Sequence, residues 1–181
     1  MRAATGAALA VQALRLPELH ACTTVAAYLS IGTEPPTQHL LQTLLLRGVR
    51  VLTPVLRPDH DLDWTEYDET RRPVMTSRGL REPAGERLGV DAVATVGAVI
   101  VPALAVDECG MRLGRGGGSY DRALARVPPR TPTSALLSDG EVVPDVPAEP
   151  HDRPVDIAVT PSRVWRFYRR DTEPHSGGGQ P

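Results

Sequence analysis

The order of apolar segments in the first third of the chain constrains its fold more than any other feature of the sequence. Residues 25–31 (VAAYLSI) are an apolar run of strand length with β-branched and aromatic side chains. Residues 38–47 (QHLLQTLLLR) place leucines on one helical face, with Thr37 as the predicted N-cap and Gly48 as the stop. Residues 49–56 (VRVLTPVL) are almost continuously apolar, which is typical of a strand covered on both faces. The sequence therefore predicts a strand, helix and strand unit with a parallel sheet.

Later apolar runs continue this alternation. We expect buried strands near 92–104 (AVATVGAVIVPAL), at 133–138 (TSALLS) and at 156–161 (DIAVTP), whereas the polar residues 57–83 predict a loop with some strand. Alternating strands and helices are typical of the α/β class. Residues 1–168 are therefore predicted to form a single three-layer α/β/α domain with a mostly parallel central sheet.

The length, charge and composition of the chain exclude several classes of function. The 181 residues fit one domain, and residues 169–181 carry too little apolar surface to fold, so we expect a disordered polar tail there. The formal net charge of −2 provides no field for nucleic acid, and the sequence contains no secretory segment or apolar run of membrane length. Cys22 and Cys109 are not spaced as a metal site. We expect a cytoplasmic monomer without nucleic-acid or membrane partners.

All 20 basic side chains are arginines, because the sequence contains no lysine. A genome rich in Arg, Ala, Gly and Pro codons is the simplest reason. A Schiff base to a substrate needs lysine, and so does the usual phosphate-binding P-loop. Both mechanisms are thereby excluded. Any binding of phosphate must depend on arginine side chains and backbone amides.

The strongest local motif is the glycine-rich segment 112–124 (RLGRGGGSYDRAL), which runs into a helix predicted at 119–127. Glycines permit positive φ and close approach of the backbone, so that successive N–H groups can point at one ligand. The following helix adds its positive dipole end. Arg112, Arg115 and Arg122 offer guanidinium groups to supplement these amides. The motif predicts a phosphate-binding loop.

Two familiar phosphate motifs do not fit this segment. A P-loop ends in Gly-Lys-Ser/Thr, and a dinucleotide fingerprint needs glycine in place of Ser119 and a strand directly before Gly114. A flexible glycine-rich turn without a ligand is a second interpretation. Asp121 also has two interpretations, because an acid in the first helical turn stabilises the helix and can also reach phosphate-bound Mg²⁺.

Three segments together resemble the 5-formyltetrahydrofolate cyclo-ligases, also called methenyltetrahydrofolate synthetases. Residues 101–124 (VPALAVDECGMRLGRGGGSYDRAL) closely match the signature of that family. Residues 28–37 (YLSIGTEPPT) are similar to its segment of strand, acid and helix start, and residues 149–161 (EPHDRPVDIAVTP) to its closing Glu-x-His-Asp-x-x-x-Asp pattern. The segments occur in the family's order, and the resemblance covers roughly residues 12–165.

The resemblance implies an ATP- and Mg²⁺-dependent closure of 5-formyltetrahydrofolate to 5,10-methenyltetrahydrofolate with release of ADP and phosphate. A formamide oxygen is a poor leaving group, so the γ-phosphoryl is first transferred to it. Nitrogen ten of the folate then attacks the activated carbon and expels phosphate. Positioning and neutralisation of charge are the protein's main tasks in such a reaction.

The resemblance also implies roles for single residues. Arg115 neutralises transferring charge and Tyr120 lies beside the reactants, so both are expected to be catalytic. Glu34 matches the family acid that contacts the folate, although a solvated loop acid is its other interpretation. The expected folate-binding residues are Leu29, Glu34 and Tyr120. The expected ATP-binding residues are Arg112, Leu113, Gly114, Arg115, Gly116, Gly117, Gly118, Ser119 and Tyr120. The expected Mg²⁺ ligands are Asp121 and Asp156.

The sequence departs from the family pattern at its beginning. Family members start with a helix rich in Lys and Arg that supplies a basic residue to ATP, whereas residues 1–14 (MRAATGAALAVQAL) contain only Arg2. The basic helix is therefore expected to be truncated. Either the start codon is assigned too late, which we favour, or part of the ATP site is lost. Ser119 stands where the family often has an aromatic residue, which should alter packing near the folate.

Two other functions compete with the cyclo-ligase. A non-catalytic folate-binding protein would keep Glu34 and Tyr120 but fail at phosphoryl transfer. A sugar-phosphate or acyl-transfer enzyme would use the loop for another phosphate, but the sequence lacks an obvious catalytic Glu or Lys for those reactions. The roles of His151, Asp152 and Trp64 stay open, since each residue suits either the site or the structure.

Overall fold

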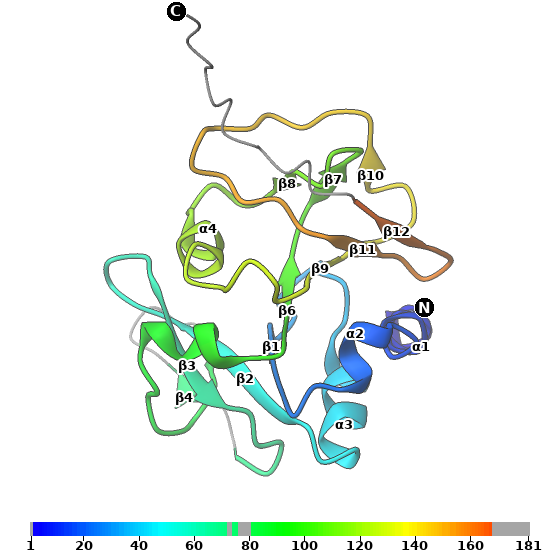
Figure 1. The fold of residues 1–181 in the computed structure, drawn as a ribbon. Helices are drawn as coiled ribbons and strands as arrows, with labels where there is room; N and C mark the ends of the chain where they lie inside the picture. Colours follow the sequence, from blue (N-terminus) through cyan, green and yellow to red (C-terminus); the bar gives the residue numbers. More distant parts are fainter. Residues whose placement is uncertain (1, 72–73, 76–80, 168–181) are drawn as a thin grey trace, which may run out of the picture.

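A seven-stranded sheet forms the centre of the computed structural model, which describes residues 2–71, 74–75 and 81–167. The inner strands are parallel to one another, and the two edge strands of this sheet are antiparallel to their neighbours. The mostly parallel sheet predicted from the sequence is confirmed. The strands lie in the order β12 (Val164–Arg166), β11 (Ile157–Val159), β9 (Thr133–Leu136), β6 (Ala98–Pro102), β1 (Thr24–Ala27), β2 (Arg50–Leu56) and β3 (Leu62–Glu66) (Figure 1).

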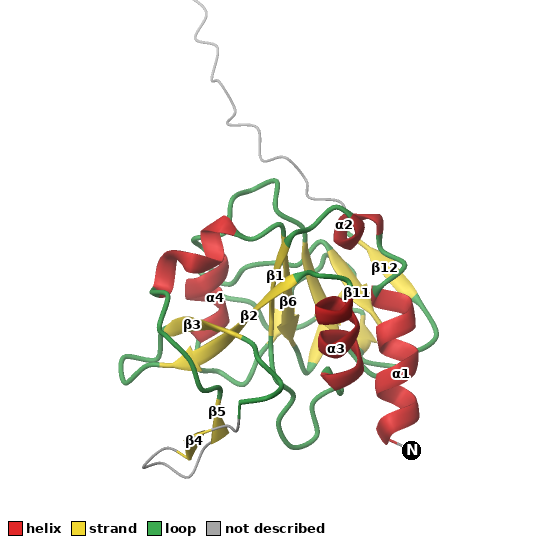
Figure 2. Cartoon of the chain, turned by 90° about the horizontal axis from the view of Figure 1, so that it is seen from below, coloured by secondary structure: helices red, strands yellow, loops and turns green. Residues whose placement is uncertain are grey.

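Helices cover both faces of this sheet. Alternate residues of β1 point to opposite faces, so Val25 belongs to one apolar core and Ala26 to the other. The three-layer α/β/α arrangement is therefore as predicted (Figure 2). The first core lies beneath α1 (Arg2–Ala13), α2 (Pro17–His20) and α3 (Gln38–Leu46), and the second beneath η1 (Val90–Thr95) and α4 (Ser119–Leu124).

The βαβ unit predicted in the first third of the chain is present, but its first strand is shorter than expected. β1 ends at Ala27, whereas the sequence predicts a strand to residue 31. Local side-chain bonds replace the sheet ladder here, because Ser30 N donates to Thr37 Oγ1 (3.1 Å) and Ile31 N donates to the Glu34 carboxylate (2.7 Å). Thr37 is the N-cap residue of α3 by position, but its hydroxyl is committed to this bond and not to the helix.

Several short elements were not predicted. The apolar run near 92–104 is not one strand, because η1 precedes β6 within it. A small second sheet has the order β10 (Val142–Val143), β7 (Ala105–Asp107) and β8 (Arg112–Leu113), and β4 (Val74–Met75) pairs with β5 (Arg81–Glu82). The small sheet matters for function because β8 is followed directly by residues 114–118 (GRGGG), here named the glycine loop.

The sequence led to one prediction for each end of the chain. The predicted disordered tail, residues 169–181, lies outside the described residues. Residues 2–13, in the region where a truncated helix was expected, form the helix α1, which packs against α3 (Figure 2). Within the described ranges, none of the helices has the length and apolar character needed to cross a bilayer.

Candidate functional site

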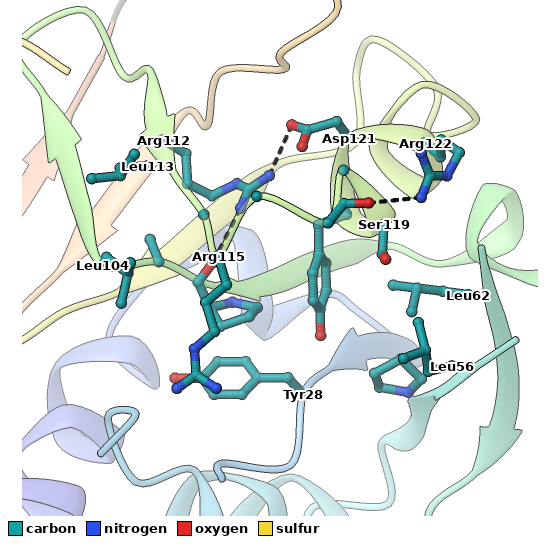
Figure 3. Close-up of a pocket in the computed structure, with 18 of the residues that line it drawn as sticks. Tyr28, Leu56, Leu62, Leu104, Arg112, Leu113, Arg115, Ser119, Asp121 and Arg122 are labelled. Carbon is teal, nitrogen blue, oxygen red and sulfur yellow. Dashed lines mark hydrogen bonds and ion pairs between the residues drawn. The ribbon is translucent and has the colours of Figure 1, made fainter. Parts of the chain in front are cut away.

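A pocket of about 750 Å³ opens at the carboxyl ends of the central parallel strands (Figure 3). Tyr28 follows β1, and Pro102 and Leu56 are the last residues of β6 and β2. From β1 the chain passes through α3 to β2 on one side, and the later strand β6 lies on the other side of β1. The strand order therefore reverses at β1 and β6, which is where open α/β sheets bind ligands.

Nearly all the residues predicted from the sequence meet in this pocket. They come from the turn after β1, from β8, from the glycine-rich segment and from the start of α4. The predicted residues that line the pocket are Leu29, Glu34, Arg112, Leu113, Gly114, Arg115, Gly116, Gly117, Gly118, Ser119, Tyr120 and Asp121.

Asp156, one of the two expected Mg²⁺ ligands, is placed elsewhere. Its Oδ2 accepts hydrogen bonds from Thr133 N (2.8 Å) and Thr133 Oγ1 (2.9 Å), and the residue borders a separate, smaller pocket beside Pro132 and Ile157. The structure does not bring Asp121 and Asp156 together in one cavity. Over the described part of the chain, no group of three or more His, Cys, Asp or Glu side chains is arranged to hold a metal ion.

The glycine-rich segment presents unpaired backbone amides to the pocket. Gly116 (φ +82°) and Gly118 (φ +62°) adopt the left-handed conformations that glycine allows without strain. The N–H groups of Gly116, Gly117 and Gly118 donate no hydrogen bond to another described residue. α4 has only 6 residues, so the expected contribution of its dipole is small beside that of the loop amides. Three consecutive glycines with unpaired amides in the lining of one pocket are suited to an anion.

Arg112 fixes a positive charge at the floor of this loop. Its side chain is buried, and its Nη2 donates to Asp121 Oδ1 (2.8 Å), while its guanidinium lies 5.9 Å from the centre of the Tyr120 ring (Figure 3). Asp121 Oδ1 also accepts from Arg153 N (3.2 Å). The pair therefore joins β8, α4 and the segment before β11, and Arg112 is held by the protein itself.

Arg115 and Glu34 form a looser pair at the pocket mouth. Arg115 Nη2 lies 3.4 Å from Glu34 Oε1, and the Arg115 side chain is 56% exposed whereas that of Glu34 is 12% exposed. Glu34 is held by the hydrogen bond that its carboxylate accepts from Ile31 N. Glu34 is therefore not a solvated loop acid, and Arg115 is the arginine that can turn toward a bound ligand.

Two tyrosines, the buried Tyr28 and the partly buried Tyr120, complete the pocket wall. Burial raises the pKa of Tyr28 and of Tyr120 well above the usual range, and the nearby Glu34 carboxylate raises both further. Tyr28 donates its hydroxyl to Pro35 O (3.0 Å). Tyr120 therefore stays a neutral phenol at physiological pH, which can donate a hydrogen bond but cannot act as a base.

Arg122 lines the pocket and also binds backbone. Its Nη2 donates to two backbone carbonyls, His60 O (2.7 Å) and Gly117 O (2.8 Å), which uses both hydrogens of that nitrogen. No described residue accepts a hydrogen bond from its Nη1 or Nε. Arg122 therefore joins two backbone segments, and its role as a phosphate ligand stays a prediction.

One pocket wall was missed by the sequence reasoning. Residues 147–149, together with His151 and Asp152, line the pocket, so the two residues left open by the sequence belong to its surface. His151 is exposed and lies 3.4 Å from the Glu149 carboxylate. Trp64, by contrast, is buried in the core beneath η1 and does not line the pocket. The alternation of apolar and polar residues at 62–66 (LDWTE) was the sequence signal that could have placed it in a strand.

A doubly wound α/β domain with an anion loop at its switch point is typical of proteins that bind phosphorylated ligands. The sequence model of the 5-formyltetrahydrofolate cyclo-ligase family matches residues 1–161. The chain belongs to this family. It is 42% identical to a 5-formyltetrahydrofolate cyclo-ligase of Mycolicibacterium smegmatis over 148 residues, which cover 77% of this chain and 74% of that protein. It is 34% identical to the Escherichia coli K12 cyclo-ligase over 165 residues, covering 90% and 91%.

Solved structures agree with the fold. A 5,10-methenyltetrahydrofolate synthetase of Aquifex aeolicus matches with a TM-score of 0.73 and 26% identity, over 97% of this chain and 88% of that one. A synthetase of Mycoplasma pneumoniae matches with a TM-score of 0.67 over 88% and 87%, and at 16% identity this likeness concerns the fold alone. The family resemblance drawn from the sequence is thereby confirmed.

We predict that Asp121→Asn lowers the free energy of unfolding by about 3–5 kcal/mol, because it leaves the buried Arg112 charge without its carboxylate. Urea denaturation followed by circular dichroism measures this. Glu66→Gln, which breaks the exposed pair with Arg50, is the matched control and should cost less than about 1 kcal/mol. Equal losses for the two variants would show that the Arg112 pair is not buried in solution.

We predict that Tyr120 ionises only above the ordinary tyrosine pKa of about 10. Because the raised pKa belongs to the folded state, its contribution to stability is complete below pH 10 and is lost as the pH rises through the folded pKa. Alkaline titration at the phenolate absorbance, with Tyr120→Phe subtracted from the unmodified chain, isolates this residue. A difference step centred at or below pH 10 would contradict the burial of the phenol.

Proposed function

We propose that this protein uses ATP to close 5-formyltetrahydrofolate to 5,10-methenyltetrahydrofolate, with release of ADP and phosphate. One observation carries the proposal. The unpaired amides of Gly116, Gly117 and Gly118 line the same pocket as Glu34 and Tyr120. An anion loop and a folate-contacting acid in one cavity support a reaction between a phosphoryl group and a folate.

The ATP phosphates would lie on the glycine loop. The residues proposed to bind ATP are those predicted from the sequence, Arg112 to Tyr120, all of which line the pocket. Backbone amides can hold phosphate oxygens without any lysine, and the exposed Arg115 guanidinium is proposed to neutralise the charge of the γ-phosphoryl as it is transferred. Arg112 contributes a fixed charge from below, since it is committed to Asp121.

The folate would occupy the side of the pocket formed by the turn after β1. Leu29 offers an apolar contact, Glu34 a carboxylate fixed by Ile31 N, and Tyr120 a neutral hydroxyl. The pocket volume of about 750 Å³ lies in the upper part of the range of roughly 300–1,000 Å³ seen for ligand sites, which suits a site for two substrates.

In the proposed reaction the formyl oxygen attacks the γ-phosphorus, so that an oxygen–phosphorus bond forms and the bond to the ADP oxygen breaks. Nitrogen ten then attacks the formyl carbon, the carbon–oxygen bond breaks, and phosphate leaves with the oxygen. The nitrogen loses its proton and the methenyl bridge remains. Arg115 is proposed to neutralise the transferring charge, and the Tyr120 phenol to donate a hydrogen bond to the reacting oxygen.

Mg²⁺ fits this site through one of its two expected ligands. Asp121 lines the pocket, and its Oδ2 accepts no hydrogen bond from the described residues, whereas Oδ1 binds Arg112 and Arg153 N. Mg²⁺ on a nucleotide commonly takes one or two carboxylates and completes its shell with phosphates and water. Asp121 would hold the ion, which when bound neutralises phosphate charge. The position of Asp156 outside the pocket does not support its role as a partner ligand.

A second candidate is a non-catalytic folate-binding protein that has lost part of its ATP site. Arg2 is the single basic residue of α1, and its Nη2 donates to Glu34 O (3.1 Å). α1 therefore supplies no further cation to a nucleotide. This candidate binds 5-formyltetrahydrofolate but does not turn over ATP.

We predict an ATP- and Mg²⁺-dependent rise in methenyltetrahydrofolate absorbance when the purified chain receives 5-formyltetrahydrofolate. Arg115→Ala should lower the rate by about a hundredfold, because the charge of the transferring phosphoryl is then not neutralised. Arg50→Ala is the matched control, since Arg50 pairs with Glu66 away from the pocket, and it should retain the rate.

Each outcome of this assay has one meaning. Full activity in Arg115→Ala would remove Arg115 from the mechanism. Folate binding without any rise in absorbance would favour the non-catalytic candidate. Absence of both binding and turnover in the folded chain would contradict the proposed function as a whole.

A further inference from the structure

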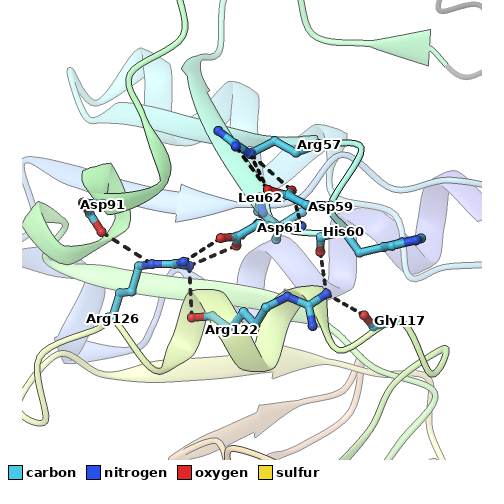
Figure 4. Close-up of polar contacts among 9 residues, drawn as sticks. All are labelled: Arg57, Asp59, His60, Asp61, Leu62, Asp91, Gly117, Arg122 and Arg126. Atoms are coloured by element: carbon cyan, nitrogen blue, oxygen red, sulfur yellow. Dashed lines mark hydrogen bonds and ion pairs between the residues drawn. The ribbon is translucent and has the colours of Figure 1, made fainter.

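Two arginines of α4 and its following turn connect the glycine loop to a distant part of the chain (Figure 4). Arg122 Nη2 bridges Gly117 O (2.8 Å), inside the glycine loop, and His60 O (2.7 Å), in residues 57–61. These five residues join β2 to β3 and are here named the β2–β3 loop. A single nitrogen thus joins two segments that are 57 residues apart, from position 60 to position 117.

Arg126 reinforces the same connection one helical turn further on. Its guanidinium holds the Asp61 carboxylate with two bonds, Nη2 to Oδ2 (2.5 Å) and Nη1 to Oδ1 (3.0 Å), and its Nε lies 3.4 Å from Asp91. The hydrogen bond from Arg126 also lowers the pKa of Asp61, so that the carboxylate stays ionised in the folded chain. The β2–β3 loop is therefore fixed to α4 at two adjacent residues, His60 and Asp61.

The backbone at this contact is unusual. His60 has a φ of +63° and is the non-glycine residue with positive φ among those the structure describes. A non-glycine residue in this region costs free energy, and it persists where surrounding contacts hold it. The contact is also close to the ligand pocket, because Leu56 and Leu62, on either side of the loop, both line it.

We propose that Arg122 is a positioning residue for the phosphate loop, and that the β2–β3 loop sets its position. Because the carbonyl and the N–H of a trans peptide point in opposite directions, the bond from Arg122 to Gly117 O directs the N–H of Gly118 away from Arg122. That amide is one of the unpaired donors of the pocket. This inference rests on the proposed binding of ATP phosphates at the loop.

The geometry distinguishes this role from a contribution to stability alone. The Arg122 residue is exposed, and its partners are carbonyls that water can reach when the side chain is removed. Loss of such bonds leaves no buried charge unpaired, so the fold survives. What changes is the orientation of the Gly117 peptide, which affects nucleotide binding.

The test compares Arg122→Ala and Asp61→Ala with Arg57→Ala. Arg57 pairs with Asp59 within the β2–β3 loop, and its described hydrogen bonds and ion pair do not involve α4, so it is a matched control. We expect Arg122→Ala to raise KM for ATP about tenfold, as loss of a charged hydrogen bond does, with kcat and KM for the folate changed by less than about twofold. Asp61→Ala should raise KM for ATP in the same direction, and Arg57→Ala should leave it unchanged.

A second measurement does not depend on activity. The ¹⁵N relaxation order parameters of Gly117 and Gly118, measured without any nucleotide, should be lower in Arg122→Ala and Asp61→Ala than in the unmodified chain and in Arg57→Ala. Arg122→Lys, which can still donate to a carbonyl, should recover part of the KM effect.

The inference and the proposed function fail in different ways. Unchanged KM for ATP and unchanged order parameters in Arg122→Ala, with only a lower melting temperature, would overturn the positioning role. An unmodified chain that turns over no ATP would contradict the proposed function, while the relaxation experiment would still decide whether the β2–β3 loop fixes the glycine loop.

Discussion

The backbone amides of the glycine loop are the feature on which the rest of this structure depends. A chain without lysine has only arginines and amides for binding phosphate, and here the amides of Gly116, Gly117 and Gly118 have no partner among the described residues. Backbone N–H groups without a protein acceptor are tolerated where they face a ligand site. The parallel sheet places that site, since the strand order reverses at β1 and β6, whose carboxyl ends border the same pocket as the loop.

The arginines around this loop have separate tasks that their side-chain partners determine. Arg112 is buried and paired with Asp121, so it supplies a fixed charge. Arg122 donates to two carbonyls, so it acts on the shape of the loop. Arg115 is exposed and only loosely paired with Glu34, so it is the one of these three that is able to move with the reaction. Guanidinium groups suit such different tasks because their donors lie in a fixed plane.

Much of this arrangement could be predicted from the sequence. The apolar runs at 25–31 and 49–56 indicated parallel strands, and the glycine-rich motif indicated an anion loop, because both signals are local. Contacts between distant segments carry no local signal. Residues alone could not show that Arg122 binds His60 O, or that Asp156 binds Thr133 instead of entering the pocket. The end of β1 was misjudged for a local reason, since Thr37 and Glu34 take the amides that would have extended it.

The most direct test of this account is the amide NMR spectrum of the chain during titration with a non-hydrolysable ATP analogue and Mg²⁺. The account predicts that the amide signals of Gly116, Gly117 and Gly118 shift downfield, because each N–H gains a phosphate acceptor. Signals of the smaller pocket beside Pro132 and Ile157 should stay in place. Saturable shifts that spare the three glycines would contradict the claim that the phosphates lie on this loop.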